Sequence, residues 1–143
     1  MCSSDLFPSH DRRGYYVVVI SNQSTIARGT AKGFNFHEMF MSYGCDLYEI
    51  CPHDSSDNCN CRKPKNGMLY LICCKLGIEP DQCLVIGDRL SDVECALSLG
   101  ASALMVSTGR GVSEYRKALS SGLSVSSIAI FSDTVSILPG FSK

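Results

Sequence analysis

Four residues that bind soft metals stand in two pairs near the middle of the chain: Cys51 with His53, and Cys59 with Cys61. Because alternate side chains of an extended segment point the same way, the two side chains of each pair can bind the same metal ion. We call each such pair a clip. The residues between the clips, 54–58, are all turn formers, which lets the chain fold back and bring the clips together. Three thiolates and one imidazole are a closed ligand set for structural zinc. The spacing therefore predicts a Cys₃His zinc site, with free thiols or a disulfide as the alternatives.

A second group of residues suits phosphate chemistry. Ser21 and Asn22 follow one run of apolar residues, Asp88 follows another, and Lys63 comes directly after the second clip. In open parallel sheets, ligands bind beyond the carboxyl ends of the strands. Serine and asparagine donate hydrogen bonds, lysine supplies positive charge, and aspartate is a hard-oxygen ligand for Mg²⁺. This combination indicates a phosphoryl group held beside a metal ion.

Each of these residues also has an ordinary structural explanation. Ser21 and Asn22 could close a strand as turn residues, Asp88 could favour the dipole of a following helix, and Lys63 could be a solvated surface lysine. Their common placement at strand ends favours the functional interpretation.

Hydrophobic periodicity predicts strands that alternate with helices. Near-continuous apolar runs, typical of buried parallel strands, lie at 15–20, 47–50, 83–86, 101–106 and 128–131. Helical spacing is found at 34–43, 68–76, 92–99 and 113–120. Ser91 and Glu94 form a capping-box pattern for the third of these helices. The alternation predicts an α/β fold with a mostly parallel sheet covered by helices.

Length and composition predict one globular domain, 1–143, with a disordered lead-in at 1–13. A net charge of −1 favours neither a nucleic acid nor a membrane as a general partner. There is no apolar run of membrane-spanning length, and the first residues are not patterned as a signal peptide. Nine cysteines, an odd number without a secretory signal, favour a reducing compartment, the cytoplasm. We expect four of them to fill the core: Cys73, Cys74, Cys83 and Cys95.

Three blocks of sequence resemble, in order, motifs of the haloacid dehalogenase (HAD) superfamily. They are VISNQSTIARG at 19–29, the segment 51–69 that ends in CNCRKPKNGML, and IGDRLSDVECA at 86–96. Together they most resemble the branch that contains heptose-bisphosphate and histidinol-phosphate phosphatases. The resemblance implies a three-layer Rossmann-like fold with a zinc loop, 51–63, in place of a cap domain. It also implies Mg²⁺-dependent hydrolysis of a small phosphorylated metabolite, such as a sugar phosphate or histidinol phosphate.

The resemblance assigns roles to the residues that would hold the phosphate. Ser21 and Asn22 match the phosphate-binding second motif. Lys63 matches the lysine of the third motif, which balances the charge of the phosphate during catalysis. Arg62 matches a cation on the substrate side.

The resemblance likewise implies two kinds of metal site. Asp88 matches the Mg²⁺-binding aspartate of the fourth motif, and Asp92 matches a weaker, supporting acid. The zinc of this branch is structural: it shapes the substrate entrance and takes no part in bond breaking. Its ligands match Cys51, His53, Cys59 and Cys61.

The family's nucleophile motif has no match in the 143 residues. In the family, one aspartate attacks phosphorus and a second, two residues later, acts as general acid and base. Both lie in an Asp-x-Asp-Gly segment after the central strand, between the strands matched here by 15–20 and 83–86. The nearest imitation, 11–14, reads Asp-Arg-Arg-Gly and has no apolar strand before it. We therefore expect a gap that the two strands close, that a partner chain fills, or that reflects an incomplete sequence.

Two functional hypotheses follow from this pattern. In the first, the chain is a HAD-family phosphatase that is inactive or truncated as it stands. In the second, it is a non-catalytic, zinc-binding α/β domain that binds phosphate or a partner without hydrolysis. A zinc-ribbon-like interaction module is disfavoured, because three motif blocks in order would then be a coincidence.

Overall fold

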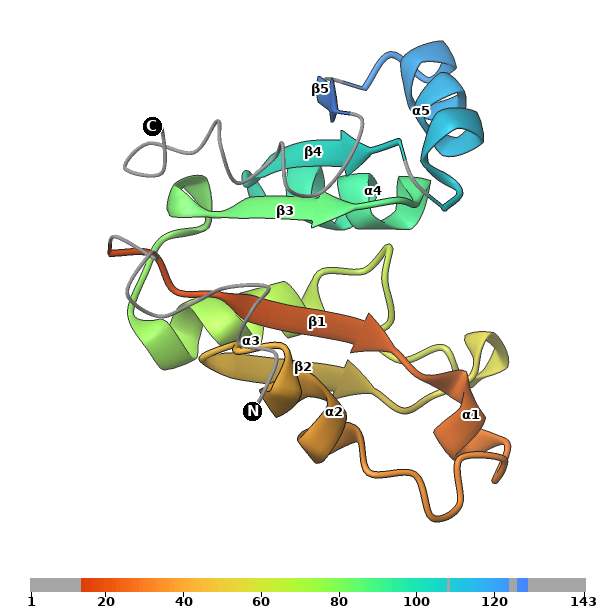
Figure 1. The fold of residues 1–143 in the computed structure, drawn as a ribbon. Coiled ribbons are helices and arrows are strands. Elements are labelled where there is room, and N and C mark those ends of the chain that lie inside the picture. Colours follow the sequence, from red (N-terminus) through yellow and green to blue (C-terminus); the bar gives the residue numbers. More distant parts are fainter. Residues whose placement is uncertain (1–13, 108, 124–125, 129–143) are drawn as a thin grey trace. The chain divides into compact units, whose positions relative to one another are not determined.

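The computed structural model describes residues 14–107, 109–123 and 126–128. The predicted disordered lead-in lies outside these residues. Strands and helices alternate along the described chain (Figure 1). The described residues fall into two compact units, one of residues 14–59 and one of the described residues from 60 onward. The single domain stays a prediction.

The first unit is built on two parallel strands, β1 (Val18–Asn22) and β2 (Leu47–Cys51). Their register runs from Val18 opposite Leu47 to Asn22 opposite Cys51. The ladder extends one step further, because the Gln23 N–H donates to the Cys51 carbonyl at 2.8 Å. β1 therefore ends later than predicted, and Ser21 and Asn22 are its last two residues rather than the loop after it.

Two short helices connect these strands: α1 (Ser24–Ala27) and α2 (Phe36–Ser42). α2 lies within the predicted range 34–43, whereas α1 forms where the sequence pattern did not predict a helix. The Asn35 side chain caps α2 by accepting the Glu38 N–H at 2.9 Å. Phe40 of α2 is 3% exposed and packs on Tyr48 of β2, which anchors the helix to the sheet.

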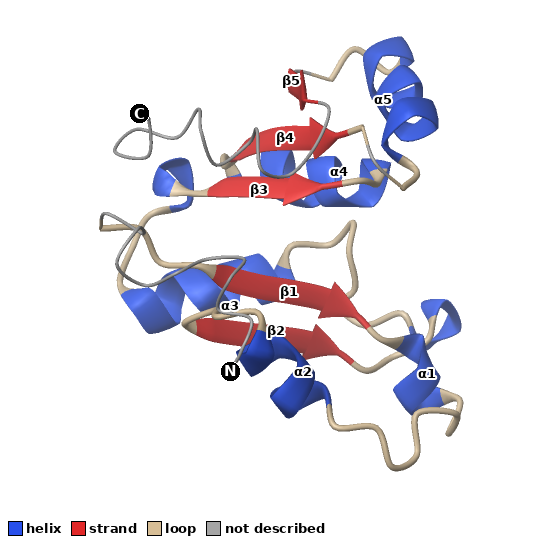
Figure 2. Cartoon of the chain, in the orientation of Figure 1, coloured by secondary structure: helices blue, strands red, loops and turns tan. Residues whose placement is uncertain are grey.

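The second unit contains three parallel strands in the order β3 (Leu84–Gly87), β4 (Ser102–Val106) and β5 (Ser126–Ile128). Helix α4 (Leu90–Leu99) packs on β3 and β4, and α5 (Gly111–Ser120) packs on β4 (Figure 2). β5 begins earlier than predicted, and 129–131 lie outside the described residues.

Helix α3 (Gly67–Leu76) also belongs to the second unit. It ends at the predicted residue, Leu76, and is followed by Gly77 with a φ of 66°. Two 3-10 turns complete the described elements, η3 (Ser55–Asp57) and η4 (Pro80–Gln82). The buried side of α3 consists of Met68, Leu69, Ile72 and Cys73.

The predicted start of α4 was wrong. Ser91 lies inside the helix, and Arg89 occupies the N-cap position. Asp92, not Glu94, reaches back to the cap: its Oδ2 accepts the Arg89 N–H at 3.2 Å. The capping acid therefore stands two residues earlier than the pattern suggested.

The predicted core cysteines divide into two groups. Cys73 and Cys95 are buried, at 5% and 0% exposed. Burial raises the pKa of Cys95 to about 11, and burial together with Cys73 raises that of Cys83, which is half-buried, to about 12. Cys74 is exposed, contrary to the prediction, because the helix turns it about 100° away from Cys73.

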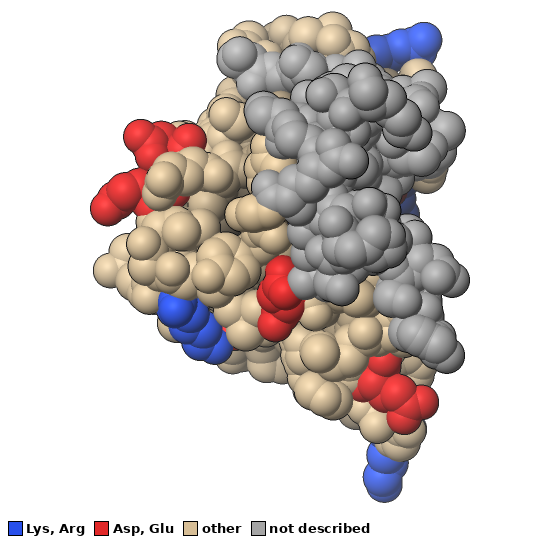
Figure 3. All heavy atoms as spheres, turned by 60° about the vertical axis from the view of Figure 1, so that its left-hand side comes forward, with Lys and Arg blue, Asp and Glu red and all other residues tan. Residues whose placement is uncertain are grey.

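All strand pairings in the described chain are parallel, as predicted. Among the described residues, β1 and β2 form a two-stranded sheet, and β3 stands first in the three-strand order of the second unit. Within the described residues, no helix has both the length and the apolar character to cross a membrane. Acidic and basic side chains of these residues are interspersed on the face drawn in Figure 3.

Gly111, at the start of α5, should tolerate no side chain. A Cβ there would collide with the backbone carbonyl of Val106, which cannot move without disturbing β4. We expect Gly111→Ala to lower the free energy of unfolding by about 2 kcal/mol or more, measured by urea denaturation. The exposed Ser113→Ala on the same helix is the control and should change it by less than about 0.5 kcal/mol. Equal stabilities would contradict this close approach.

Candidate functional site

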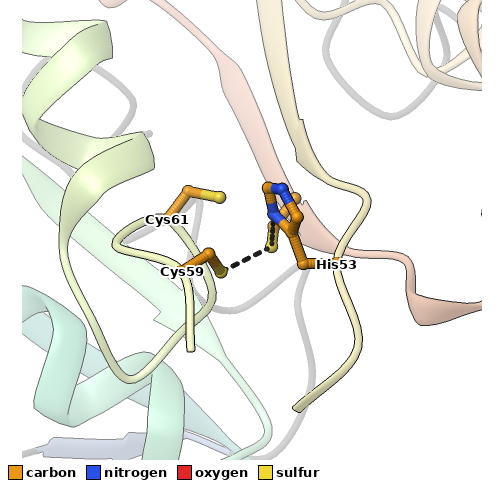
Figure 4. A group of neighbouring side chains, drawn as sticks. His53, Cys59 and Cys61 are labelled. Carbon is orange, nitrogen blue, oxygen red and sulfur yellow. Dashed lines mark hydrogen bonds between the residues drawn. The ribbon is translucent and has the colours of Figure 1, made fainter. Parts of the chain in front are cut away.

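The four predicted soft-metal ligands lie together. Cys51 ends β2, His53 follows it, and Cys59 and Cys61 come after η3. One ligand atom from each residue lies within 4.8 Å of the other three. The Cys51 Sγ is 3.5 Å from His53 Nδ1 and 3.6 Å from Cys59 Sγ. In Figure 4 the labelled side chains of this cluster point toward one another.

The geometry of this cluster fits a zinc ion. A tetrahedral site with Zn–S bonds of about 2.3 Å has ligand atoms separated by about 3.8 Å, close to the two distances above. Cys51 is fully buried, and the other three residues are half-buried. The donor set is therefore compact, shielded and of the right chemistry for a closed structural site.

The turn between the two clips is held by its own carboxylates. Asp54 Oδ1 accepts the Ser55 N–H at 2.7 Å, and Asp57 Oδ2 accepts the Asp54 N–H at 2.8 Å. Asn58 then adopts the left-handed conformation, with a φ of 52°. The predicted turn residues thus reverse the chain and return it to the cluster.

Arg28, just after α1, braces the same turn. Its Nε and Nη2 donate to the two carboxylate oxygens of Asp54 at 2.8 and 2.9 Å. This guanidinium holds the pKa of Asp54 well below its usual range. Because the Arg28 side chain is 58% exposed, the pair orients the turn more than it stabilises the fold.

In the second unit, Lys63, the predicted phosphate-binding lysine, forms an ion pair with Asp92. Lys63 Nζ donates to Asp92 Oδ1 at 2.6 Å, and the two side chains are only 13% and 11% exposed. The other oxygen of Asp92 accepts the Arg89 N–H. A Cβ on Gly87 would collide with the Asp92 carboxylate, so this glycine allows the acid to lie against β3.

Asp88 occupies the turn between β3 and α4. It is half-buried, and its Oδ2 accepts the Arg110 N–H at 3.3 Å. Both oxygens of Asp92 accept hydrogen bonds from protein donors, and Asp88 accepts the Arg110 N–H through Oδ2. The arrangement suits Asp88 as a hard-oxygen metal ligand and Asp92 as the support of Lys63.

The other predicted phosphate-binding residues belong to both units: Ser21 and Asn22 to the first, and Arg62 to the second. Ser21 Oγ, at the end of β1, accepts from Gln23 Nε2 at 2.8 Å, and Asn22 is the next residue. Arg62 is half-buried, and its carbonyl accepts the Lys65 N–H at 2.8 Å. The structure thus brings together Lys63 with Asp92, while the phosphate-binding roles of Ser21, Asn22 and Arg62 stay predictions.

Sequence reasoning missed two contacts of this region. Asp92 was predicted as a weak metal ligand, not as the partner of Lys63, which lies 29 residues away. Glu114 was not singled out, yet its Oε2 accepts the Leu90 N–H at 2.8 Å. No local pattern could have revealed either contact, because both join distant parts of the sequence.

Replacement of one cluster ligand should remove the metal. We expect about one zinc ion per purified chain by elemental analysis, and loss of that zinc in Cys59→Ser because three ligands bind it far more weakly. Cys74→Ser, which changes an exposed cysteine outside the cluster, is the matched control and should keep its zinc. Zinc retained equally in both variants would contradict the site.

The Lys63–Asp92 pair should contribute measurably to stability. Asp92→Asn leaves a mostly buried ammonium without its counter-charge, so we expect a loss of about 2 kcal/mol or more in the free energy of unfolding. Lys117→Gln, which removes an ammonium that is 63% exposed, should cost less than about 0.5 kcal/mol. Urea denaturation of the two variants compares them directly, and equal losses would show that burial of the first pair is unimportant.

Known proteins are similar to this chain in sequence. The HAD-hydrolase-like family model matches residues 60–126. The D-glycero-β-D-manno-heptose-1,7-bisphosphate 7-phosphatase of Pseudomonas aeruginosa is 36% identical over 118 residues, which are 76% of this chain and 66% of the relative. The histidine biosynthesis bifunctional protein HisB of Actinobacillus pleuropneumoniae is 39% identical over 99 residues, 63% of this chain and 27% of that protein.

A solved structure matches the fold. The crystal structure of D,D-heptose 1,7-bisphosphate phosphatase from B. bronchiseptica, complexed with magnesium and phosphate, aligns with a TM-score of 0.71 at 28% identity. The alignment covers 88% of this chain and 73% of that one. The chain spans 57 to 67% of the length of the first four heptose-bisphosphate phosphatases that it matches. The predicted α/β, Rossmann-like fold is confirmed, and the chain belongs to the HAD-like hydrolase superfamily, in the branch that includes the heptose-bisphosphate phosphatases and HisB.

Proposed function

We propose that this chain provides the phosphate-holding part of a Mg²⁺-dependent HAD phosphatase. Its substrate is a small phosphorylated metabolite, a heptose bisphosphate or histidinol phosphate. The observation that carries the proposal is the Lys63–Asp92 contact of 2.6 Å, made in the first turn of the helix that follows Asp88. A fixed cation beside a hard-oxygen ligand is the arrangement that a phosphoryl group and a divalent metal ion require.

Each residue of the site has a distinct task in this proposal. The Lys63 ammonium faces the charge of the phosphate, and Asp92 holds that ammonium in a fixed direction through one of its three N–H donors. Ser21 and Asn22 donate hydrogen bonds to phosphate oxygens. Asp88 binds Mg²⁺, and the bound metal ion neutralises negative charge on the phosphate. Catalysis in such a site is positioning and charge balance.

The Cys/His cluster has a structural task in this proposal. It binds zinc and fixes a polar loop that has little apolar core of its own, so that Arg62, next to Cys61, faces the substrate. The cytoplasm suits this site because thiols must stay reduced to ligate zinc. The names of the similar proteins support a heptose bisphosphate as the first substrate to test and histidinol phosphate as the second.

Hydrolysis also needs an attacking carboxylate and a general acid. No two aspartates in the 143 residues lie two positions apart, so the sequence offers no pair with the family's spacing. We propose that this pair comes from a strand outside these residues, in a longer chain or a partner, which pairs with the strand edges of β1 or β3. The alternative function is a zinc-binding domain that holds phosphate without hydrolysis. The lack of an aspartate pair with the family's spacing in the 143 residues favours this alternative.

The 143-residue chain should therefore bind phosphate without hydrolysing phosphate esters. With Mg²⁺ present, we expect orthophosphate binding by ³¹P NMR, and a loss of about tenfold or more in affinity for Lys63→Met because a charge-assisted contact is removed. The neighbouring exposed Lys65→Met is the matched control and should bind as the unchanged chain does. Turnover of p-nitrophenyl phosphate that Asp88→Asn abolishes would contradict the need for an outside carboxylate.

A fusion separates the two candidate functions. The segment of the P. aeruginosa relative that precedes its matched region is joined to the N-terminus of this chain. Turnover in the fusion, lost in its Asp88→Asn variant, would support a phosphatase whose attacking strand is supplied from elsewhere. A folded, phosphate-binding fusion without turnover would favour the non-catalytic domain.

A further inference from the structure

The first turn of α5 contacts the turn that carries Asp88 at two points. The Arg110 N–H donates to Asp88 Oδ2 at 3.3 Å. Four residues later, Glu114 Oε2 accepts the Leu90 N–H at 2.8 Å. These contacts span 22 and 24 residues of sequence, so they hold the 88–90 turn from a separate helix.

The Glu114 contact has the features of a strong hydrogen bond. Leu90 begins α4, and an N–H in the first turn of a helix has no acceptor within that helix. A carboxylate there is also favoured by the helix dipole. The Glu114 side chain is only 14% exposed, and Lys117 Nζ lies 2.7 Å from its Oε1. Lys117 and the Leu90 N–H both lower the pKa of Glu114, because both favour its charged form.

Gly109 brings the same segment close to the Asp88 carboxylate. Its φ is 62°, and a Cβ built there would lie 2.5 Å from Asp88 Oδ2. The carboxylate therefore rests against a backbone that has no side chain in the way. Together with the two hydrogen bonds, this approach leaves Asp88 little freedom to turn.

We propose that Glu114 is a positioning residue for Asp88: by holding the Leu90 N–H, it fixes the 88–90 turn and thus the direction of the Asp88 carboxylate. The inference rests on the proposed function, in which Asp88 binds Mg²⁺. Glu114 acts through Leu90 and needs no contact with metal or phosphate. Mutation of a residue that hydrogen-bonds a metal ligand typically weakens metal binding by about 10- to 100-fold. Because Glu114 acts one step further away, we expect an effect at the lower end of this range.

Metal affinity tests the effect of Glu114 on Asp88. Mn²⁺ serves as the probe, followed by water-proton relaxation in the zinc-loaded chain with phosphate present. Glu114→Ala should weaken Mn²⁺ binding by about tenfold. Glu114→Gln should fall between, because its amide oxygen still accepts the Leu90 N–H but carries no charge. Glu94→Gln, which removes an exposed carboxylate from α4, is the matched control and should leave the affinity unchanged.

Amide hydrogen exchange tests the contact without a metal. In Glu114→Ala the Leu90 amide should exchange about tenfold faster or more, because its acceptor is gone. The Arg110 amide should also exchange faster, because it donates to Asp88 and reports whether that carboxylate has moved. Amides of β3 and of the later turns of α5 should exchange as before, which separates this effect from loss of the helix.

The two measurements distinguish this inference from the proposed function. If Asp88→Asn weakens Mn²⁺ binding and Glu114→Ala does not, the positioning role is overturned and the proposed function stands. The metal role of Asp88 is overturned if Asp88→Asn binds Mn²⁺ as tightly as the unchanged chain does. It is also overturned if the unchanged chain itself does not bind Mn²⁺. In that case Arg110 exchange decides alone: an unchanged rate in Glu114→Ala overturns the positioning role, and a faster rate supports it.

Discussion

The ion pair between Lys63 and Asp92 is the interaction on which the second unit's candidate site depends. Both side chains are nearly withdrawn from water, and either charge alone would be costly in that position. The pair therefore ties the loop before α3 to the first turn of α4, with an N···O distance of 2.6 Å. The second oxygen of Asp92 caps its own helix through Arg89. One carboxylate thus sets both the direction of a cation and the start of a helix.

Glycines make this arrangement sterically possible. Gly87 leaves room for the Asp92 carboxylate, and Gly109 leaves room for that of Asp88. Gly67 has a similar task, because a Cβ there would meet the carbonyl of Asn60, next to the cluster ligand Cys61. In each case the close neighbour belongs to a residue of a predicted site or to its immediate support. The site residues therefore pack directly against the backbone of these glycines. A side chain at any of the three positions would collide with its neighbour, which explains why glycine stands there.

The sequence predicted the features that are local and repetitive. The apolar runs identified the strands, helical spacing identified α2 to α5, and the paired clips identified the Cys/His cluster that the structure brings together. It failed where a distant partner decides. β1 extends to Asn22 because β2 continues beside it, and Asp92 turns toward Lys63 across 29 residues. The N-cap of α4 was misplaced for a different, local reason: Ser91 and Glu94 fit the capping-box pattern, but Asp92 accepts the Arg89 N–H instead, so the helix begins two residues earlier than predicted.

The charged groups of the candidate site are held in place independently of any nucleophile. The cation, its counter-carboxylate and the candidate Mg²⁺ ligand are held by contacts within the second unit, and none of these contacts involves a nucleophile. Binding a phosphate requires such pre-arranged charge, because the groups then need not reorganise when the ligand arrives. Bond breaking requires in addition a carboxylate pair at a spacing that the 143 residues do not contain. The contacts that would recognise phosphate are therefore independent of the residues that would break its ester bond, so different segments of a fold can meet the two requirements.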